Sequence, residues 1–228
     1  MRRLVVALAC TSVLLTACSD DAQVSDGRTP EEVMELTKTT LDETSGVTLT
    51  LASEDLPDGV TALVAAEGVG THAPAFDGEI TVVLGGAQLD VPVVAVDGTV
   101  WAEVPFTTGW SDVDPAEYGA PDPAQLMSTD GGFSSLLVAT EGLEEGESVR
   151  GGEDNKEVLT EFSGTVSADQ VSTVIPSAEG DFDATYRINA DGELREARLT
   201  GVFYPDTEPM TYILGFEDYG TEKDIVAP

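Results

Sequence analysis

The sequence predicts an α+β fold, in which about ten strands form one large, curved antiparallel sheet that is accompanied by three helical segments. Two observations lead to this prediction. Short runs rich in Val, Ile and aromatic residues follow one another with hairpin-length links, which is typical of an antiparallel meander rather than of βαβ units. Helical signals are confined to three segments, one near the N-terminus and two in the second half of the chain.

The N-terminus has the pattern of a lipoprotein signal peptide. A basic start at residues 1–3 precedes an apolar run over 4–15, which is too short to cross a bilayer as a helix. The sequence Leu-Thr-Ala then leads to Cys18 and resembles the bacterial lipobox. We therefore predict a signal peptide over 1–17, and a Cys18 that is diacylated and anchors the chain to the outer face of the cell membrane. An ordinary secretory signal with an incidental cysteine is the alternative.

Behind the signal peptide, we predict a flexible tether over residues 18–28 and a single domain over residues 29–228, because no Pro/Gly/Ser-rich linker divides the rest of the chain. The formal net charge of −33 leaves no basic stripe for nucleic acid or anionic headgroups. Cys10 lies inside the predicted signal peptide. The mature chain therefore keeps only Cys18 and can form no internal disulfide.

Three helical segments follow from capping signals and apolar periodicity. The first begins at Thr29, which suits the N-cap, and is ended by Gly46. In the second, Pro123 opens a short helix, glycines interrupt it, and a further apolar face starts at Phe133. The third is predicted over 167–175 from a capping box at its start and the proline that follows.

Strands are predicted where β-branched and aromatic residues gather between turn signals. Asp-Gly pairs at 97–98 and 191–192 favour two-residue hairpin turns. The predicted strands span residues 79–84, 91–96, 99–104, 183–189, 193–204 and 210–216.

Apolar residues occupy both faces of the early strands. Val91, Val93 and Ala95 point to one side of their strand, while Val94 and Val96 point to the other. Both faces should therefore be covered. Three helical segments are few for so wide a sheet, and two arrangements satisfy the pattern. In one, the sheet curls around the helices and encloses an apolar space; in the other, a two-layer core is fully packed.

Motifs that would carry catalysis or bind a metal are missing from the sequence. The one histidine, His72, could act as the base of a catalytic triad only beside a nucleophilic serine. The sequence has no Gly-x-Ser-x-Gly motif for such a serine, since the segment 132–136 lacks the last glycine. One histidine and no cysteine beyond Cys18 cannot build a typical zinc site. The abundant carboxylates lack EF-hand spacing, and no phosphate-binding loop is present. We therefore expect no enzyme, no metal and no cofactor.

Four segments, in the same order, give the chain a resemblance to a known family. They are residues 98–102 (GTVWA), 122–137 (DPAQLMSTDGGFSSLL), 164–176 (GTVSADQVSTVIP) and 215–228 (GFEDYGTEKDIVAP). Together with the lipobox, they make the chain similar to the mycobacterial LppX/LprA/LprF/LprG lipoproteins, and most similar to the LprG-like members. The similarity extends over residues 29–228.

The resemblance implies a half-barrel sheet wrapped over helices, with a hydrophobic cavity between them. It implies that the cavity binds acylated lipids, including triacylated glycolipids or triacylglycerol, and that the protein carries them toward the outer envelope. It also implies a major-facilitator efflux pump as a partner. The heavier acidity of this chain and its loop 203–209 depart from the family pattern, which puts the headgroup and the partner surface in question.

Cavity residues are carried over only where the pattern matches. The stretch 78–86 matches a family strand that lines the cavity, which places Ile80 and Val82 on the ligand face. Strand alternation adds Val93 and Ala95 from the neighbouring strand. The predicted walls on the helix side are Phe133, Leu136, Leu137, Val171, Val174 and Ile175. Ordinary core packing is the alternative for each of these residues.

Two rival functions remain open. A packed lipoprotein could support an envelope transporter or another protein partner without binding lipid. An exposed apolar patch would favour that scaffold, and a large enclosed cavity would count against it. A hydrolase acting on acyl chains is a more distant alternative, which would depend on His72.

Overall fold

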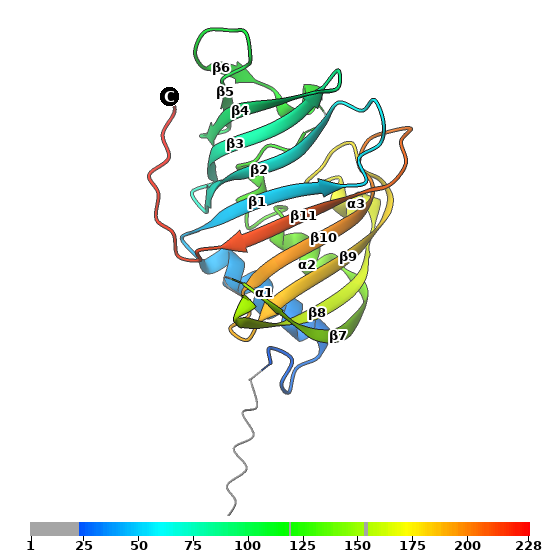
Figure 1. Ribbon diagram of the computed structural model, residues 1–228. Coiled ribbons are helices and arrows are strands. Elements are labelled where there is room, and N and C mark those ends of the chain that lie inside the picture. The colour runs from blue at the N-terminus through cyan, green and yellow to red at the C-terminus, as the bar shows by residue number, and fades with distance from the viewer. Residues whose placement is uncertain (1–22, 119, 153–154) are drawn as a thin grey trace, which may run out of the picture.

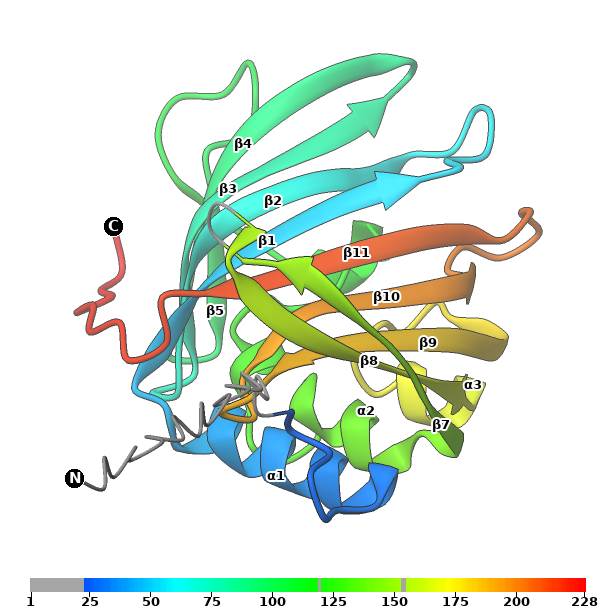
Figure 2. The ribbon, with the colours of Figure 1, turned by 60° about the horizontal axis from the view of Figure 1, so that its bottom comes forward.

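The structure is a computed structural model that describes residues 23–118, 120–152 and 155–228 (Figure 1). Eleven strands in the described residues form one antiparallel sheet that curves over the helices and stays open at its edges (Figures 1 and 2). The predicted fold class is thus confirmed. The predicted signal peptide and Cys18 lie outside the described residues.

The sheet consists of two meanders that meet at its centre. β1 pairs with β11, so that the strand order is β6-β5-β4-β3-β2-β1-β11-β10-β9-β8-β7. The first meander contains β1 (Gly46–Glu54), β2 (Ala62–Thr71), β3 (Ala75–Leu84), β4 (Ala87–Val96), β5 (Thr99–Ala102) and β6 (Ser111–Val113). The second contains β7 (Glu141–Gly151), β8 (Glu157–Val166), β9 (Glu179–Asn189), β10 (Leu194–Val202) and β11 (Met210–Glu217).

Each of the six predicted strand ranges overlaps an observed strand, with bounds that differ by up to four residues, and β1, β2, β6, β7 and β8 lie outside those ranges. Between β4 and β5, Asp97 has a φ of 54° and Gly98 a φ of 75°. Two consecutive left-handed residues are what the predicted two-residue hairpin turn requires.

The first helix, α1 (Pro30–Glu43), begins as predicted at Thr29. The Thr29 hydroxyl accepts a hydrogen bond from the Glu32 amide at 3.3 Å, and the Glu32 carboxylate accepts one from the Thr29 amide at 2.9 Å. These reciprocal bonds satisfy two donors that a helix end otherwise leaves unpaired. The helix ends at Glu43, three residues before Gly46.

The other helical segments are shorter than predicted. Two 3₁₀ turns, η1 (Pro115–Tyr118) and η2 (Gln125–Met127), precede α2 (Ser134–Ala139), and α3 (Ala168–Val171) has only one turn. The predicted capping box at Ser167 is wrong, because the Ser167 side chain makes no capping hydrogen bond. The hydroxyls of Ser172 and Thr173 donate to the carbonyls of the residues three positions before them, and such local bonds compete with helix continuation.

At its N-terminal end, the packed structure includes residues that we assigned to the tether. Val24 is fully buried, and its carbonyl accepts a hydrogen bond from the Arg28 guanidinium at 2.9 Å. The Ser25 hydroxyl donates to the Glu145 carboxylate of β7 at 2.7 Å. The ordered domain therefore begins before the predicted boundary at residue 29.

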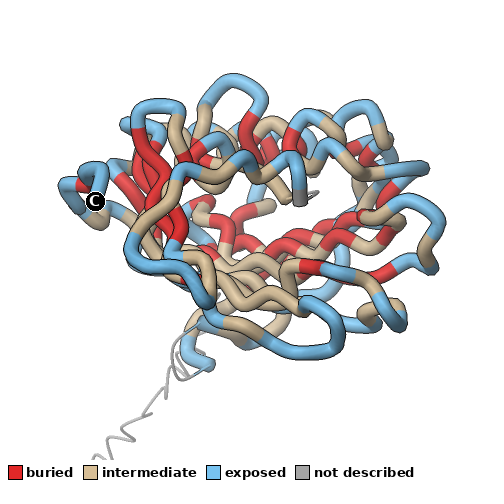
Figure 3. The backbone as a smooth tube through the Cα atoms, turned by 90° about the horizontal axis from the view of Figure 1, so that it is seen from above, coloured by how far each residue is buried: buried red, intermediate tan, exposed pale blue. Residues whose placement is uncertain are grey.

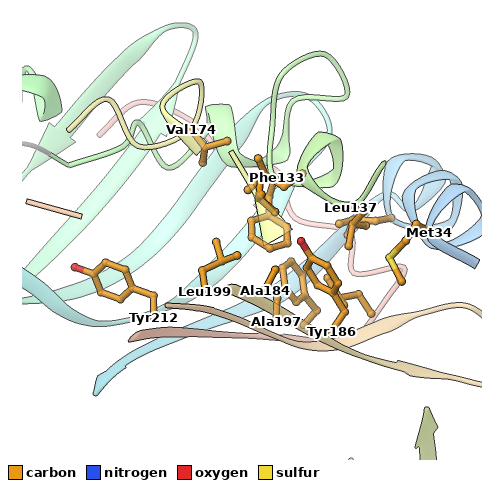
Figure 4. Packing of buried hydrophobic residues seen from close by; sticks show 14 of the residues in the cluster. Met34, Phe133, Leu137, Val174, Ala184, Tyr186, Ala197, Leu199 and Tyr212 are labelled. Carbon is orange, nitrogen blue, oxygen red and sulfur yellow. The ribbon is translucent and has the colours of Figure 1, made fainter. Parts of the chain in front are cut away.

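The main core lies between the helices and the second meander (Figure 4). Met34 of α1 and Leu137 of α2 pack there against inward side chains of the sheet such as Tyr186. Buried stretches of the chain gather in the interior, while the hairpin tips are exposed (Figure 3). The α-helices thus cover the β7–β11 half of the sheet and leave the concave face of the β1–β5 half without an α-helical layer (Figure 2).

The outer face of β4 is also covered, as its two-sided apolar pattern predicts. Val94 and Val96 form a small cluster with Ala75 and with Ile225 of the C-terminal segment. Val91, Val93 and Ala95 belong to a separate cluster on the inner face. The C-terminal residues therefore provide the second cover that the helices do not supply.

Candidate functional site

An apolar cavity of about 270 Å³ occupies the concave side of the β1–β5 half. The segment that connects β6 to α2 forms its other wall. None of the described residues that line it is charged, and only Thr50 and Thr61 have polar side chains. Among the residues that form its sheet side are Leu49, Leu51, Phe76, Ile80, Val82, Leu89, Val91 and Val93.

Strand register gathers the sheet side of this cavity into one surface. Ile80 of β3 lies opposite Val91 of β4, and Val82 lies opposite Leu89. Residues that are directly opposite in an antiparallel pair project to the same face, so the four side chains form one continuous apolar patch. Val83, one position along β3, does not line the cavity.

The Phe76 ring lies against a part of the sheet that has no side chains. Gly68 of β2 and Gly78 of β3 are opposite each other, and a Cβ atom added to either would approach the Phe76 Cζ atom to 2.5 Å or 2.8 Å. The two glycines therefore make room for the aromatic ring at the inner wall of the cavity.

The wall opposite the sheet is rich in proline. Pro115, Pro121 and Pro123 of the segment between β6 and α2 line the cavity, and Pro105 of the β5–β6 connection does so as well. Proline has no backbone N–H, so an irregular segment built from prolines places fewer unpaired donors against an apolar space. The Asp122 carboxylate accepts a hydrogen bond from the Ala124 amide at 2.9 Å and so holds the following turn in place.

A second cavity of about 40 Å³ adjoins the first. Leu51, Leu63, Leu126, Phe133 and Leu214 contribute to the walls of both cavities. The Phe133 amide donates to the Leu126 carbonyl at 2.9 Å, and the Phe133 ring packs on Phe216 with centroids 5.3 Å apart. Phe133 and Leu126 are therefore held between the two spaces, and a shift of their side chains would join them.

Two tyrosines close the far side of the smaller cavity. The Tyr212 hydroxyl donates to the Leu63 carbonyl at 2.7 Å, and the Leu63 amide donates to the Tyr204 hydroxyl at 3.2 Å. The two hydroxyls lie 2.8 Å apart, which completes a cycle of three hydrogen bonds. Burial, together with the neighbouring Tyr204, holds the pKa of Tyr212 well above its ordinary value, so its hydroxyl stays neutral.

The structure separates the predicted cavity residues into three groups. Ile80, Val82, Val93 and Phe133 line the larger cavity, and Leu136, Val174 and Ile175 line the smaller one. Ala95, Leu137 and Val171 line neither and are buried in the core. Ala95 lies further along β4, opposite Phe76, and the other two lie where the helices pack directly onto the sheet.

Several wall residues lie outside the predicted set, notably Leu49, Leu51, Leu63 and Phe76. A signal for two of them was present in the sequence, because residues 46–51 (GVTLTL) alternate apolar and polar side chains as a strand does. Nothing in the local pattern marks the proline-rich wall, since its contact with the sheet depends on the path of the whole chain.

His72 has a structural position. Its Nε2–H donates to the Leu41 carbonyl at 2.6 Å and so ties the end of α1 to the turn after β2. In the segment 132–136, the Ser134 hydroxyl accepts a hydrogen bond from the Lys38 ammonium at 3.3 Å, and the Ser135 hydroxyl donates to the Gly132 carbonyl at 2.6 Å. Neither serine is bonded to the histidine.

Charged groups lie on the outer face of the sheet rather than at the cavity. Arg187 of β9 bonds to Glu161 and Glu196, at 3.1 Å and 2.9 Å. Arg195 of β10 is bound at 2.8 Å by both Glu157 and Glu193.

Within residues 23–118, 120–152 and 155–228, no three His, Cys, Asp or Glu side chains are grouped to hold a metal ion. The same residues contain no helix that is long and apolar enough to span a membrane.

Comparison with known proteins gives consistent relatives. The LppX_LprAFG lipoprotein family model matches residues 29–225. The lipoarabinomannan carrier protein LprG of Mycobacterium tuberculosis strain H37Rv is 27% identical over 212 residues, which cover 87% of this chain and 85% of the relative. The LprG protein of Mycobacterium leprae is 28% identical over 208 residues, with coverages of 87% and 84%.

Two solved structures share the fold. LprF from Mycobacterium bovis superposes with a TM-score of 0.70 at 13% identity, over 90% of this chain and 99% of that one. The lipoprotein LppX of Mycobacterium tuberculosis superposes with a TM-score of 0.62 at 14% identity, over 86% and 98%. At these identities the likeness concerns the open curved sheet and its helices.

Proposed function

Because the chain belongs to the LppX_LprAFG lipoprotein family, we propose that it binds acylated lipid in its apolar cavity and carries it across the cell envelope. The name of its LprG relatives, lipoarabinomannan carrier protein, supports a carrier role. The cavity supports the same role, and it counts against the alternative of a fully packed scaffold that holds no lipid.

The observation that carries the proposal is an interior space that no charged side chain of the described residues lines. Burial of apolar surface provides affinity for an acyl chain at about 0.8 kcal/mol for each methylene. Ten buried methylenes would contribute about 8 kcal/mol before the entropic cost of binding is subtracted. Acyl chains can thus be held without any directional polar contact, and a carrier needs no catalytic group.

The proposed cargo is a triacylated glycolipid or triacylglycerol. A volume of about 270 Å³ lies just below the range for small-ligand sites, about 300–1,000 Å³, so the cavity as it stands takes part of such a lipid. The smaller cavity behind Phe133 and the open edges of the sheet provide the room for further chains. A polar headgroup would remain outside, since the hydroxyls of Thr50 and Thr61 are the only polar side-chain groups that the described wall residues offer it.

Position in the cell is the second part of the proposal. Cleavage before Cys18 and acylation of its sulfur, including by palmitate, would fix the domain to the outer face of the cell membrane, where such lipids are made. The basis is the pattern of residues 1–18 together with the lipoprotein family match. Cooperation with a major-facilitator efflux pump is proposed on the family resemblance alone.

Native mass spectrometry of the mature chain carrying Cys18→Ser, purified gently from its own host, tests the carrier function. We expect close to one diacyl or triacyl lipid bound per chain, and the mass identifies the cargo. A chain that is empty, and that stays empty when host envelope lipids are supplied, would leave the scaffold as the better explanation.

A further inference from the structure

Two hairpin-like tips at the rim of the cavity combine exposure with the absence of charge. The first, residues 84–88, connects β3 to β4, and the second, residues 104–110, connects β5 to β6; we call them together the lip. Leu84 is 56% exposed, and Phe106 is completely exposed. Neither tip contains a charged residue, although the chain has 43 Asp and Glu residues.

The lip is continuous with the cavity. Leu84 from the first tip and Val104 and Pro105 from the second all line its wall. The amide of Glu103 donates to the Pro92 carbonyl of β4 at 3.0 Å, which fixes the start of the second tip beside the strands of the first. An apolar path therefore runs from the interior to the exposed Phe106.

Phe106 combines an unfavourable backbone conformation with complete exposure of its ring. Its φ of 70° lies in the left-handed region, which bulky residues avoid, and its ring is not packed in the core. A large aromatic ring held in water at the mouth of an apolar cavity is the kind of group that inserts into a lipid interface.

The lip faces away from the end of the domain where the chain enters it. Ser25 is bonded to Glu145 of β7, at one edge of the sheet, whereas the second tip leads into β6, at the other edge. With adjacent strands about 4.8 Å apart, the path across the sheet is about 48 Å. Figure 1 shows the dark blue start of the described chain at the bottom of the molecule and β6 at the top.

Cys18 and Gln23 are five positions apart, so at most about 18 Å of chain separates them. Since Val24 is already buried in the domain, an anchor at Cys18 would hold the β7 edge of the sheet, and not the lip, next to its membrane. We propose that the lip docks on a second lipid surface, opposite the anchoring membrane, and that the cavity opens toward that surface. This inference rests on the proposed carrier function and adds the site of lipid exchange to it.

Charge determines which surface the lip accepts. Glu79, Asp90, Glu103 and Asp112 flank the two tips, and the whole chain carries a net charge of −33. Electrostatic repulsion from anionic headgroups would oppose docking of the lip, whereas a surface of zwitterionic or uncharged lipid would not repel it. We therefore expect binding to fall as anionic lipid is added, and to recover in part when salt screens the repulsion.

The test begins with co-sedimentation of the Cys18→Ser chain with phosphatidylcholine vesicles. Phe106→Asn removes the ring and keeps a residue that tolerates the left-handed conformation. We expect this change to weaken vesicle binding roughly tenfold or more. The control is Val138→Ser, because Val138 is 46% exposed and lies on α2, away from the lip. We expect the Val138→Ser chain to bind the vesicles as tightly as the unchanged chain does. Equal binding by Phe106→Asn and the unchanged chain would overturn the assignment of the lip.

A second measurement tests the opposing surface. The chain is attached through an N-terminal hexahistidine tag in place of Cys18 to nickel-chelating vesicles, and their clustering with plain phosphatidylcholine vesicles is followed by light scattering. We expect clustering that Phe106→Asn abolishes and Val138→Ser preserves. Absence of clustering despite vesicle binding by the untethered chain would mean that the lip does not face a second membrane.

Failure of the carrier function would have a different signature. We expect the Phe106→Asn chain to retain its bound lipid in native mass spectrometry, and the cavity-blocking Ile80→Trp chain to lose lipid while still clustering vesicles. If no variant contains lipid but clustering still depends on Phe106, the carrier function fails and the docking surface stands.

Discussion

Replacing Ile80 by tryptophan should block lipid binding while leaving the fold intact. Ile80 projects from β3 into the larger cavity opposite Val91, so the indole fills part of a space of about 270 Å³ instead of displacing packed side chains. If the ring excludes three methylenes of the ligand, affinity falls by about 2.4 kcal/mol at about 0.8 kcal/mol each. That corresponds to a loss of roughly 60-fold.

The assay is displacement of a fluorescent long-chain fatty acid from the Cys18→Ser chain, with thermal unfolding measured alongside. Val83→Trp is the matched control, because Val83 lies on the same strand and does not line the cavity. We expect Ile80→Trp to bind the probe weakly at an almost unchanged melting temperature, and Val83→Trp to bind it normally. Equal probe affinities of the two variants would refute the cavity as the lipid site.

Four further substitutions test the cavity walls, a helix cap and a buried tyrosine. Phe133→Ala should join the two cavities, lower the free energy of unfolding by about 3 kcal/mol, and shift bound lipid in native mass spectrometry toward more or longer acyl chains; unchanged cargo would show that Phe133 does not separate the spaces. Tyr212→Phe leaves the Leu63 carbonyl without its donor and should cost about 1–3 kcal/mol in urea unfolding. Thr29→Ala removes the N-cap of α1 and should cost about 1 kcal/mol in the same assay. Burial raises the pKa of Tyr186 to about 12, so above pH 10 the unfolded chain loses a proton that the folded chain keeps. Stability should therefore fall from pH 10 to pH 12 by roughly 1 kcal/mol per pH unit for this tyrosine, and Tyr186→Phe should show a flatter decline.

Local sequence patterns were sufficient for the features that depend on near neighbours in the chain. The capping residues at Thr29 begin α1, the Asp97-Gly98 pair forms the turn between β4 and β5, and alternation in residues 91–96 predicts a strand covered on both faces. Each of these follows from contacts over a few residues, where backbone preference and side-chain period act directly. The collinear similarity over residues 29–228 indicated the family before the fold was known.

Tertiary structure alone decided what lies against those elements. The pairing of β1 with β11 joins residues far apart in sequence and determines which half of the sheet the helices cover. Leu137 is packed in the core where the helices meet the sheet, whereas Leu63 and Phe76 line the cavity in the other half. Ala95 is also buried, although its register partner Phe76 lines the cavity.

Hydrophobic burial is non-directional, so an apolar pattern specifies that a side chain leaves water and not whether it meets another side chain or an empty space. The position of the lip beside the cavity likewise depends on the order of strands in the sheet, which local sequence patterns do not specify. Six of the eleven described strands, their apolar faces and the family were predictable from the sequence. The path of the whole chain determined where the cavity lies.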